Sequence, residues 1–175
     1  MSTKKQVVVI GYGVAGSNIV AKLAKLKKYD ITVVSAVNYQ EVPLGITYAV
    51  ANGSDAHKKY VYDLIQEDGV KYVIATCTKL TNDSVTLSTG ETISFDVAVV
   101  ATGVSIPTFY PDPDSETTAE QRKEAINKVS EEIKSAASVL VSGGGPVGVE
   151  AAADIKLKYP AKRYVHDILK KEDKI

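Results

Sequence analysis

Residues 7–17 read VVVIGYGVAGS, and this stretch decides the fold class. Its first part is a continuous apolar run, which is typical of a strand buried on both faces of a parallel sheet. A glycine pattern G-x-G-x-x-G follows at once, and apolar residues then recur at helical spacing up to residue 26. Residues 31–34 (ITVV) form a second apolar run. The sequence therefore predicts a strand, a tight turn, a helix and a second parallel strand, a βαβ unit of about 30 residues.

The three glycines have separate roles in a turn of this kind. Gly11 permits the tight turn, Gly13 lets the backbone approach a pyrophosphate, and Gly16 lets the helix pack closely on the strand. The phosphates would lie at the amino end of the helix, where backbone N–H groups point at the ligand. In this strand–turn–helix context we predict dinucleotide binding rather than glycines that only pack the turn. The predicted contacts are Gly11, Tyr12, Gly13, Val14, Ala15 and Gly16.

One expected partner of the turn is replaced. An acidic residue usually ends the second strand of such a unit and binds the ribose hydroxyls. Ser35 stands at that position, and the next acidic residue is Glu41. A serine hydroxyl can bind the ribose without charge assistance, so we expect a weaker contact from Ser35.

A second glycine turn, SGGGPVGVE at residues 142–150, follows the apolar residues 139–141. Pro146 suits the start of a helix because its missing N–H needs no partner there, and we expect the helix over residues 149–158. The predicted contacts are Gly143, Gly145, Pro146, Gly148 and Glu150, the last in the first helical turn. Two such turns in one chain indicate two dinucleotides and a hydride that passes between them.

The remaining pattern completes an α/β prediction. Residues 70–95 hold short strand-like segments separated by turn signals and predict an inserted β-meander, and residues 96–101 (DVAVVA) predict another buried strand. We expect a Rossmann-like, mostly parallel sheet with helices on both faces and the start of a second such unit. The predicted organisation is a first domain at 1–106, a linker and helix at 107–138, and an incomplete βα unit with a polar tail at 139–175.

The helix of that linker region has a defined start. Pro107, Pro111 and Pro113 mark irregular chain. Thr117 or Thr118 is the expected N-cap, because a Glu or Gln follows three residues later, as in a capping box.

Composition excludes several classes of protein. The 175 residues contain 21 Lys plus Arg and 21 Asp plus Glu, so no basic excess favours nucleic acid. No apolar run of about 18 residues predicts a transmembrane helix, and no signal-peptide pattern opens the chain. The single cysteine, Cys77, cannot form an internal disulfide, and neither His57 nor His166 has metal-ligand companions. We expect a cytoplasmic chain without a metal site.

Taken together, four segments resemble one enzyme family. They are residues 7–17, 39–43 (YQEVP), 96–103 (DVAVVATG) and 139–160 (VLVSGGGPVGVEAAADIKLKYP). Their order and spacing resemble the N-terminal half of the pyridine-nucleotide flavoprotein oxidoreductases, specifically the apoptosis-inducing-factor homologues related to ferroptosis suppressor protein.

The resemblance implies a function. FAD would bind the first turn, with Ser35 in place of the usual acid, Ala75 at the adenine contact, and Ala101, Thr102 and Gly103 where the chain passes the FAD. NADH or NADPH would bind the second turn and reduce the flavin, which would pass electrons to a quinone or another small acceptor. No residue is identified as an acid–base catalyst. The disulfide-reducing branch is excluded because the chain has no redox cysteine pair.

Departures from the family leave three possibilities open. Tyr48 stands where the family has an arginine near the FAD phosphates, and the strand closing the second unit is expected to be absent or reduced to residues 164–165. We also expect this sequence to lack the positions by which the family selects NADH or NADPH and the segment on which its flavin ring rests. The chain is therefore an oxidoreductase, a truncated or degenerate dinucleotide-binding module without activity, or an interaction domain with unused turns. An uncovered second unit would also favour self-association.

Overall fold

The computed structural model describes residues 4–53, 56–104, 112 and 115–167. Its main sheet has four parallel strands in the spatial order β5-β2-β1-β9. They are β1 (Lys5–Ile10), β2 (Tyr29–Ser35), β5 (Val70–Ile74) and β9 (Val97–Val100). Helix α1 (Val14–Leu26) connects β1 to β2. The predicted βαβ unit and the α/β fold class are therefore confirmed.

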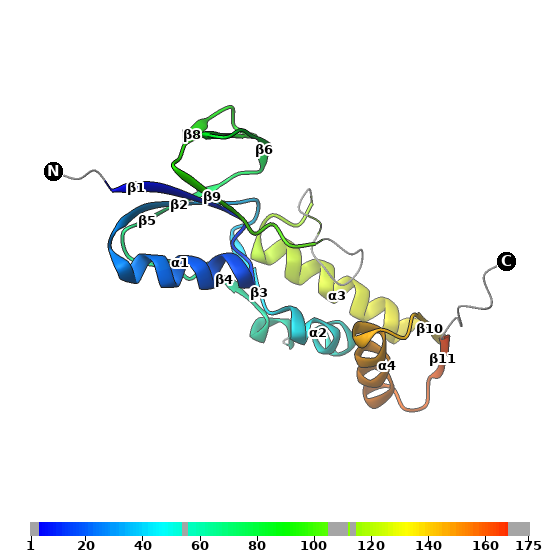
Figure 1. The fold of residues 1–175 in the computed structure, drawn as a ribbon. Helices are drawn as coiled ribbons and strands as arrows, with labels where there is room; N and C mark the ends of the chain where they lie inside the picture. Colours follow the sequence, from blue (N-terminus) through cyan, green and yellow to red (C-terminus); the bar gives the residue numbers. More distant parts are fainter. Residues whose placement is uncertain (1–3, 54–55, 105–111, 113–114, 168–175) are drawn as a thin grey trace.

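Two layers enclose this sheet. Helix α1 packs on one face, and a meander of β6 (Cys77–Leu80), β7 (Ser84–Leu87) and β8 (Thr92–Ser94) stands over the other (Figure 1). Val9 points into the core beneath α1, whereas its neighbour Val8 points into the core beneath the meander. Burial on both faces explains why β1 is apolar at successive positions.

The predicted meander was wrong in its first strand. Val70–Ile74 is β5 of the main sheet, where it pairs in parallel with residues 31–35 of β2. Only the three strands between Cys77 and Ser94 pair antiparallel as a meander. A short apolar run carries no mark of its pairing partner, because parallel pairing depends on chain that is distant in sequence.

A connecting layer lies beyond the carboxyl ends of the strands. Strand β3 (Tyr39–Glu41) pairs with β4 (Val61–Asp63), and between them lie two 3₁₀ turns (Pro43–Gly45 and Ala56–Lys59) and α2 (Ile46–Asn52). Helix α3 (Ala119–Ser135) packs on them, and buried residues of β3, α2, β4 and α3 form one core: Tyr39, Ile46, Ala49, Val50, Val61, Ala119 and Ile126.

Helix α3 begins as the sequence predicts. Thr118 is the N-cap, and its side chain accepts a hydrogen bond from the backbone N–H of Gln121, whose side chain accepts one from Thr118 in return. The capping box is therefore confirmed. The prolines of the predicted linker, at positions 107, 111 and 113, lie outside the described residues.

The second unit is more complete than the sequence predicts. It consists of β10 (Ser138–Ser142), α4 (Pro146–Lys158) and β11 (Arg163–Asp167), with β10 and β11 paired in parallel. The prediction that the closing strand is absent or reduced to residues 164–165 was wrong, because the mixed sequence RYVHD forms the five-residue strand β11 without being a continuous apolar run. Helix α4 begins at Pro146, so Glu150 lies beyond its first turn rather than within it.

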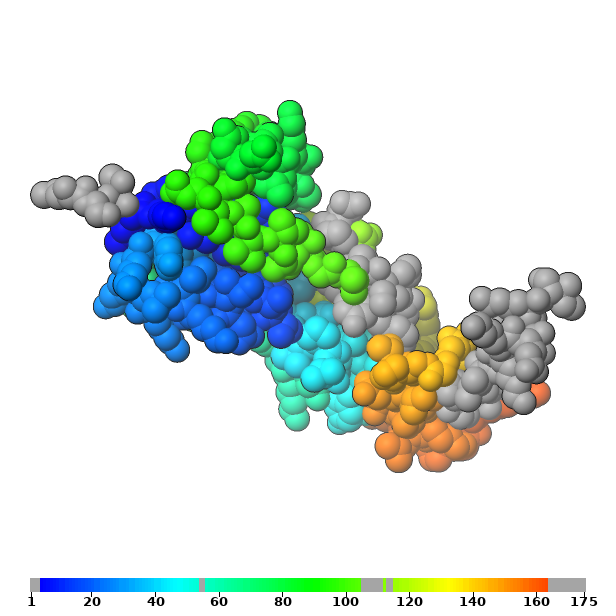
Figure 2. Space-filling model, viewed as in Figure 1, coloured from blue at the N-terminus to red at the C-terminus, as the bar shows by residue number. Residues whose placement is uncertain are grey.

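The two units lie at opposite ends of the molecule. Helix α4 packs on α2, and α2 packs on α3. In Figure 2 the second unit forms a lobe of its own beyond the α2 region. The predicted polar tail at residues 168–175 lies outside the described residues.

Candidate dinucleotide-binding site

The segments predicted to contact a first dinucleotide meet at the carboxyl edge of the main sheet. Ala75, Ser35, Gly11 and Ala101 lie at or just after the ends of β5, β2, β1 and β9, in the spatial order of those strands. The backbone N–H groups of Gly11, Ala75 and Ala101 each donate to a carbonyl of the neighbouring strand at 2.8 Å. Ligands of open α/β sheets bind outside this edge.

Two of the glycines of the first turn are required by close packing. Gly11 has φ +97°, and a Cβ there would collide with the carbonyl oxygen of Ala101. A Cβ on Gly16 would collide with the carbonyl oxygen of Gly11. The turn is thus pressed against both β9 and α1, as the predicted roles of the first and third glycines require.

The amino end of α1 is open. Gly13 is its N-cap with φ −74°, no side chain caps the helix, and its first turn holds no acidic residue. No described residue lies within 4 Å of a Cβ placed on Gly13, and Val14 and Ala15 are exposed. This end presents uncapped backbone and positive potential, so it fits a phosphate-bearing ligand.

A cavity of about 160 Å³ lies against this helix end. One side belongs to the first turns of α1, and the other to the β3–β4 pair. It is lined by Gly13, Val14, Ser17, Asn18, Gln40, Glu41, Val42 and Tyr62. The sequence identified the first two of these residues and missed the wall formed by β3 and β4.

Tyr12 lies in the glycine turn, but its ring points into the core. It is 4% exposed, its hydroxyl donates to the carbonyl of Ile65 at 2.8 Å, and it lies 3.0 Å from the hydroxyl of Tyr72. Burial raises the pKa of Tyr12, with the hydrogen bond to Tyr72 as a second cause. A contact from Tyr12 to a dinucleotide would therefore come from its backbone.

Ser35 is buried and engaged by its own chain. Its hydroxyl donates to the carbonyl of Val37 at 2.7 Å and lies 3.4 Å from the Val37 N–H. Ala75 beside it is also buried, whereas Thr102 and Gly103 beyond β9 are exposed. A ribose contact from Ser35 remains a prediction, and its hydroxyl would have to turn away from Val37 to make it.

Sequence reasoning missed a buried ion cluster behind the cavity wall. Arg122 of α3 is 2% exposed; its Nε lies 2.6 Å from Oε2 of Glu41, and its Nη1 lies 2.9 Å from Oε2 of Glu116. Burial raises the pKa of Glu41, and the hydrogen bond from Arg122 opposes that rise. Glu41 and Arg122 are 81 positions apart, so no local pattern links them.

The second turn repeats the backbone geometry of the first. Gly143 has φ +117°, a Cβ on Gly148 would collide with the carbonyl oxygen of Gly143, and Gly145 is the N-cap of α4 with φ −75°. Residues 143–146 and Glu150 are exposed. The amino end of α4 therefore also fits a phosphate-bearing ligand. The two turns are not brought together, because α2 and α3 lie between their units (Figure 1).

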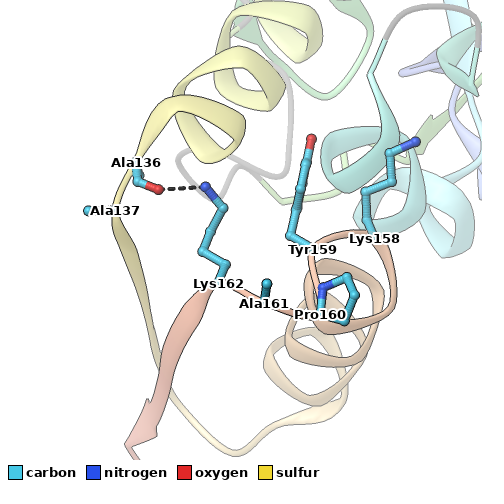
Figure 3. Close-up of a pocket in the computed structure, with 7 residues that line it drawn as sticks. All are labelled: Ala136, Ala137, Lys158, Tyr159, Pro160, Ala161 and Lys162. Carbon is cyan, nitrogen blue, oxygen red and sulfur yellow. Dashed lines mark hydrogen bonds between the residues drawn. The ribbon is translucent and has the colours of Figure 1, made fainter.

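A larger groove of about 480 Å³ lies at the opposite end of the second unit. Lys162 crosses it and donates to the carbonyl oxygen of Ala136, and the ring of Tyr159 stands beside it (Figure 3). The groove adjoins the amino ends of β10 and β11. It contains none of the predicted site residues.

Within the described ranges, no group of three or more His, Cys, Asp or Glu side chains could hold a metal ion. No helix of that part of the chain is long and apolar enough to cross a membrane.

Known proteins share both the sequence pattern and the fold. Apoptosis-inducing factor homolog A of Dictyostelium discoideum is 32% identical over 160 residues, which cover 91% of this chain and 38% of that protein. Human ferroptosis suppressor protein 1 is 27% identical over 158 residues, covering 89% and 42%. The chain thus spans about two fifths of the length of these relatives.

Solved structures agree on the fold. The sulfide:quinone oxidoreductase of Aquifex aeolicus superposes with a TM-score of 0.68 at 20% identity, over 93% of this chain and 43% of that one. The NADH:rubredoxin oxidoreductase of Clostridium acetobutylicum superposes with a TM-score of 0.64 at 22% identity, over 95% and 45%. Residues 5–168 match the family described as pyridine nucleotide-disulphide oxidoreductase. The chain belongs to this family of oxidoreductases.

Proposed function

We propose that the chain binds FAD at its first glycine turn and NADH or NADPH at its second, as part of a flavin-dependent oxidoreductase. The flavin would take hydride from the nicotinamide and pass electrons to a quinone or another small acceptor. The observation that carries the proposal is the first turn itself, where an uncapped helix end, a cavity and four strand ends converge.

Each part of the edge has a role in this proposal. The amino end of α1 holds the pyrophosphate, and the bare Cα of Gly13 leaves room for it. Ser35 and Ala75 lie on the side where the adenosine would rest, and Ala101, Thr102 and Gly103 flank the other side. The protein positions the cofactor and shields it, because the redox chemistry belongs to the flavin.

A second candidate function has its own support. The hydroxyl of Ser35 is already bonded to Val37, and the second unit is a two-stranded sheet with an exposed turn. Both features favour a dinucleotide-binding module that catalyses nothing.

The proposal is tested by measuring FAD retention by the purified wild-type chain and by a variant of the first glycine turn. Wild type should keep a flavin absorption band after incubation with FAD and desalting. Gly13→Ala should fold normally, since its φ of −74° suits alanine, and should bind FAD at least about tenfold more weakly because its Cβ fills the pyrophosphate approach.

Gly145→Ala is the matched variant, because its φ of −75° and open surroundings equal those of Gly13. It should reduce the stabilisation by NADH while FAD retention stays within about threefold of wild type. If the chain retains FAD but NADH does not bleach the flavin absorption band, the result favours the dinucleotide-binding module without activity. If neither nucleotide is bound and neither raises the melting temperature, the proposal is wrong.

A further inference from the structure

The buried Arg122 lies behind the cavity wall and contacts Glu41, the one carboxylate among the described residues that line the cavity. Glu41 ends β3 and lines the cavity together with Gly13 and Val14 at the amino end of α1. The fork of Arg122 holds both carboxylate oxygens of Glu41, with Nε to Oε2 at 2.6 Å and Nη2 to Oε1 at 3.3 Å. The third contact runs from Nη1 to Oε2 of Glu116 at 2.9 Å, and Glu116 does not line the cavity.

The arrangement matters because the cavity should take an anion. A pyrophosphate bound at the end of α1 would share its cavity with the carboxylate of Glu41. Two like charges in a partly buried space repel one another unless a cation compensates them. Arg122 supplies that charge from the far side of the wall, where it is itself sealed from solvent.

The wall is also tied to the glycine turn. Gln40, next to Glu41, accepts a hydrogen bond from the backbone N–H of Ile65 at 3.1 Å. The carbonyl of the same Ile65 accepts the hydroxyl of Tyr12 from within the turn. Hydrogen bonds joined by short covalent stretches of the chain therefore link the turn, through Ile65 and β3, to Arg122 of α3.

We propose that Arg122 is a positioning residue for the dinucleotide of the first turn: it holds the Glu41 carboxylate in the wall and neutralises it, so that the pyrophosphate can enter. The inference rests on the proposed function. It assigns to α3 a role in the first site, although α3 lies between the two units and contributes no residue to the cavity lining.

Two variants that break the same ion pair separate this role from a structural one. Arg122→Met leaves Glu41 uncompensated and should weaken FAD binding about tenfold at pH 8. Glu41→Gln removes the repelling charge, leaves Arg122 paired with Glu116, and should bind FAD as tightly as wild type or more tightly. A purely structural pair would weaken binding in both variants.

A pH series gives an independent readout. The groups that face Glu41 are Arg122 on α3, Glu116 just before α3, Tyr39 on its own strand, Tyr62 on β4 and the amino end of α1. Without Arg122, the contact that lowers the pKa of Glu41 is lost and the effect of burial is unopposed, so the carboxyl takes up its proton at a higher pH than in wild type. The loss of FAD affinity in Arg122→Met should therefore become smaller between pH 8 and pH 5.5. Over the same range, the ratio between the FAD affinities of wild type and Glu41→Gln should change little.

The experiment is an FAD titration followed by flavin fluorescence, with circular dichroism to verify folding. The double variant Arg122→Met/Glu41→Gln should return to within about threefold of wild type, because it leaves no charge in the cavity wall; Glu116, which loses its partner Arg122, does not line the cavity. If Arg122→Met does not fold, a tenfold loss in folded Glu41→Gln or in the folded double variant still overturns the inference. Equal losses in both single variants overturn it as well. Absence of FAD binding by wild type would overturn the proposed function and this inference together.

Discussion

The two glycine turns have nearly the same backbone but very different surroundings. Gly11 and Gly143 have φ of +97° and +117°, and in both turns the third glycine packs on the carbonyl oxygen of the first. Around the first turn, β9 lies beside β1, and a Cβ on Gly11 would strike Ala101. Around the second, no described residue lies within 4 Å of a Cβ on Gly143.

The difference teaches which part of a dinucleotide site is local. Glycine spacing alone sets the turn, because the strand, the turn and the first helical residues are contiguous. Enclosure depends on a further strand, and β9 reaches the first turn only after the meander. The second unit has two strands in the described chain, so its turn is formed but not enclosed.

The largest expected effect on the free energy of unfolding tests whether β9 encloses the first turn. Gly11→Ala should combine backbone strain of roughly 1–3 kcal/mol with a collision that adds roughly 1–3 kcal/mol. Gly143→Ala should show the strain alone. Urea unfolding followed by circular dichroism gives both free energies of unfolding.

Gly90→Ala is the control for strain, since Gly90 has φ +86° in the meander and no described residue within 4 Å of its Cβ position. It should match Gly143→Ala. Equal destabilisation by all three variants would show that β9 does not enclose the first turn.

A smaller effect on stability is expected from the strands that precede the two turns. Val8 and Leu140 each stand three residues before the first glycine, yet Val8 is 1% exposed and Leu140 is 65% exposed. Val8→Ala should lower the free energy of unfolding by about 2 kcal/mol, and Leu140→Ala by less than about 0.5 kcal/mol.

The outcome for Leu140 also tests self-association. If Leu140→Ala is destabilising by more than about 1 kcal/mol, something covers that face in solution. Light scattering would then distinguish a second copy of the chain from an intramolecular cover. If the chain is a monomer and Leu140→Ala does not lower its free energy of unfolding, the face around Leu140 is exposed in solution, as in the structure.

Local signals predicted the elements that contain the site. The glycines with their flanking apolar runs predicted both turns, and the Thr118–Gln121 pair predicted the start of α3. The prediction for β11 was wrong because a mixed pentapeptide has no strong period; β5 was correctly predicted as a strand, but its pairing in the meander was wrong because its partner strand is not encoded locally.

The cavity wall was beyond sequence reasoning for a related reason. Glu41 reads as a polar residue between Gln40 and Val42, and Arg122 as one of several charges on a solvated helix. Only the packing of α3 on β4 buries them together. A buried ion pair between distant positions leaves no trace in the spacing of either residue.

The smallest effect concerns Tyr12, whose counterpart in the second turn is Gly144, which has no side chain. Tyr12→Phe removes the hydroxyl that bonds to Ile65 and Tyr72 and should cost about 1–2 kcal/mol at pH 7. Burial raises the pKa of Tyr12 above the ordinary value of about 10. The folded state therefore favours the neutral phenol, so this stabilisation is complete below pH 10 and is lost as pH rises further.

The difference in stability between wild type and Tyr12→Phe should accordingly narrow from pH 8 to pH 11. Tyr48→Phe, whose ring is exposed on α2, is the matched control and should change stability by less than about 0.5 kcal/mol at either pH. A difference for Tyr12 that stays constant with pH would mean that its hydroxyl reaches water. The core side of the first turn would then be accessible to solvent, as the exposed residues of the second turn are.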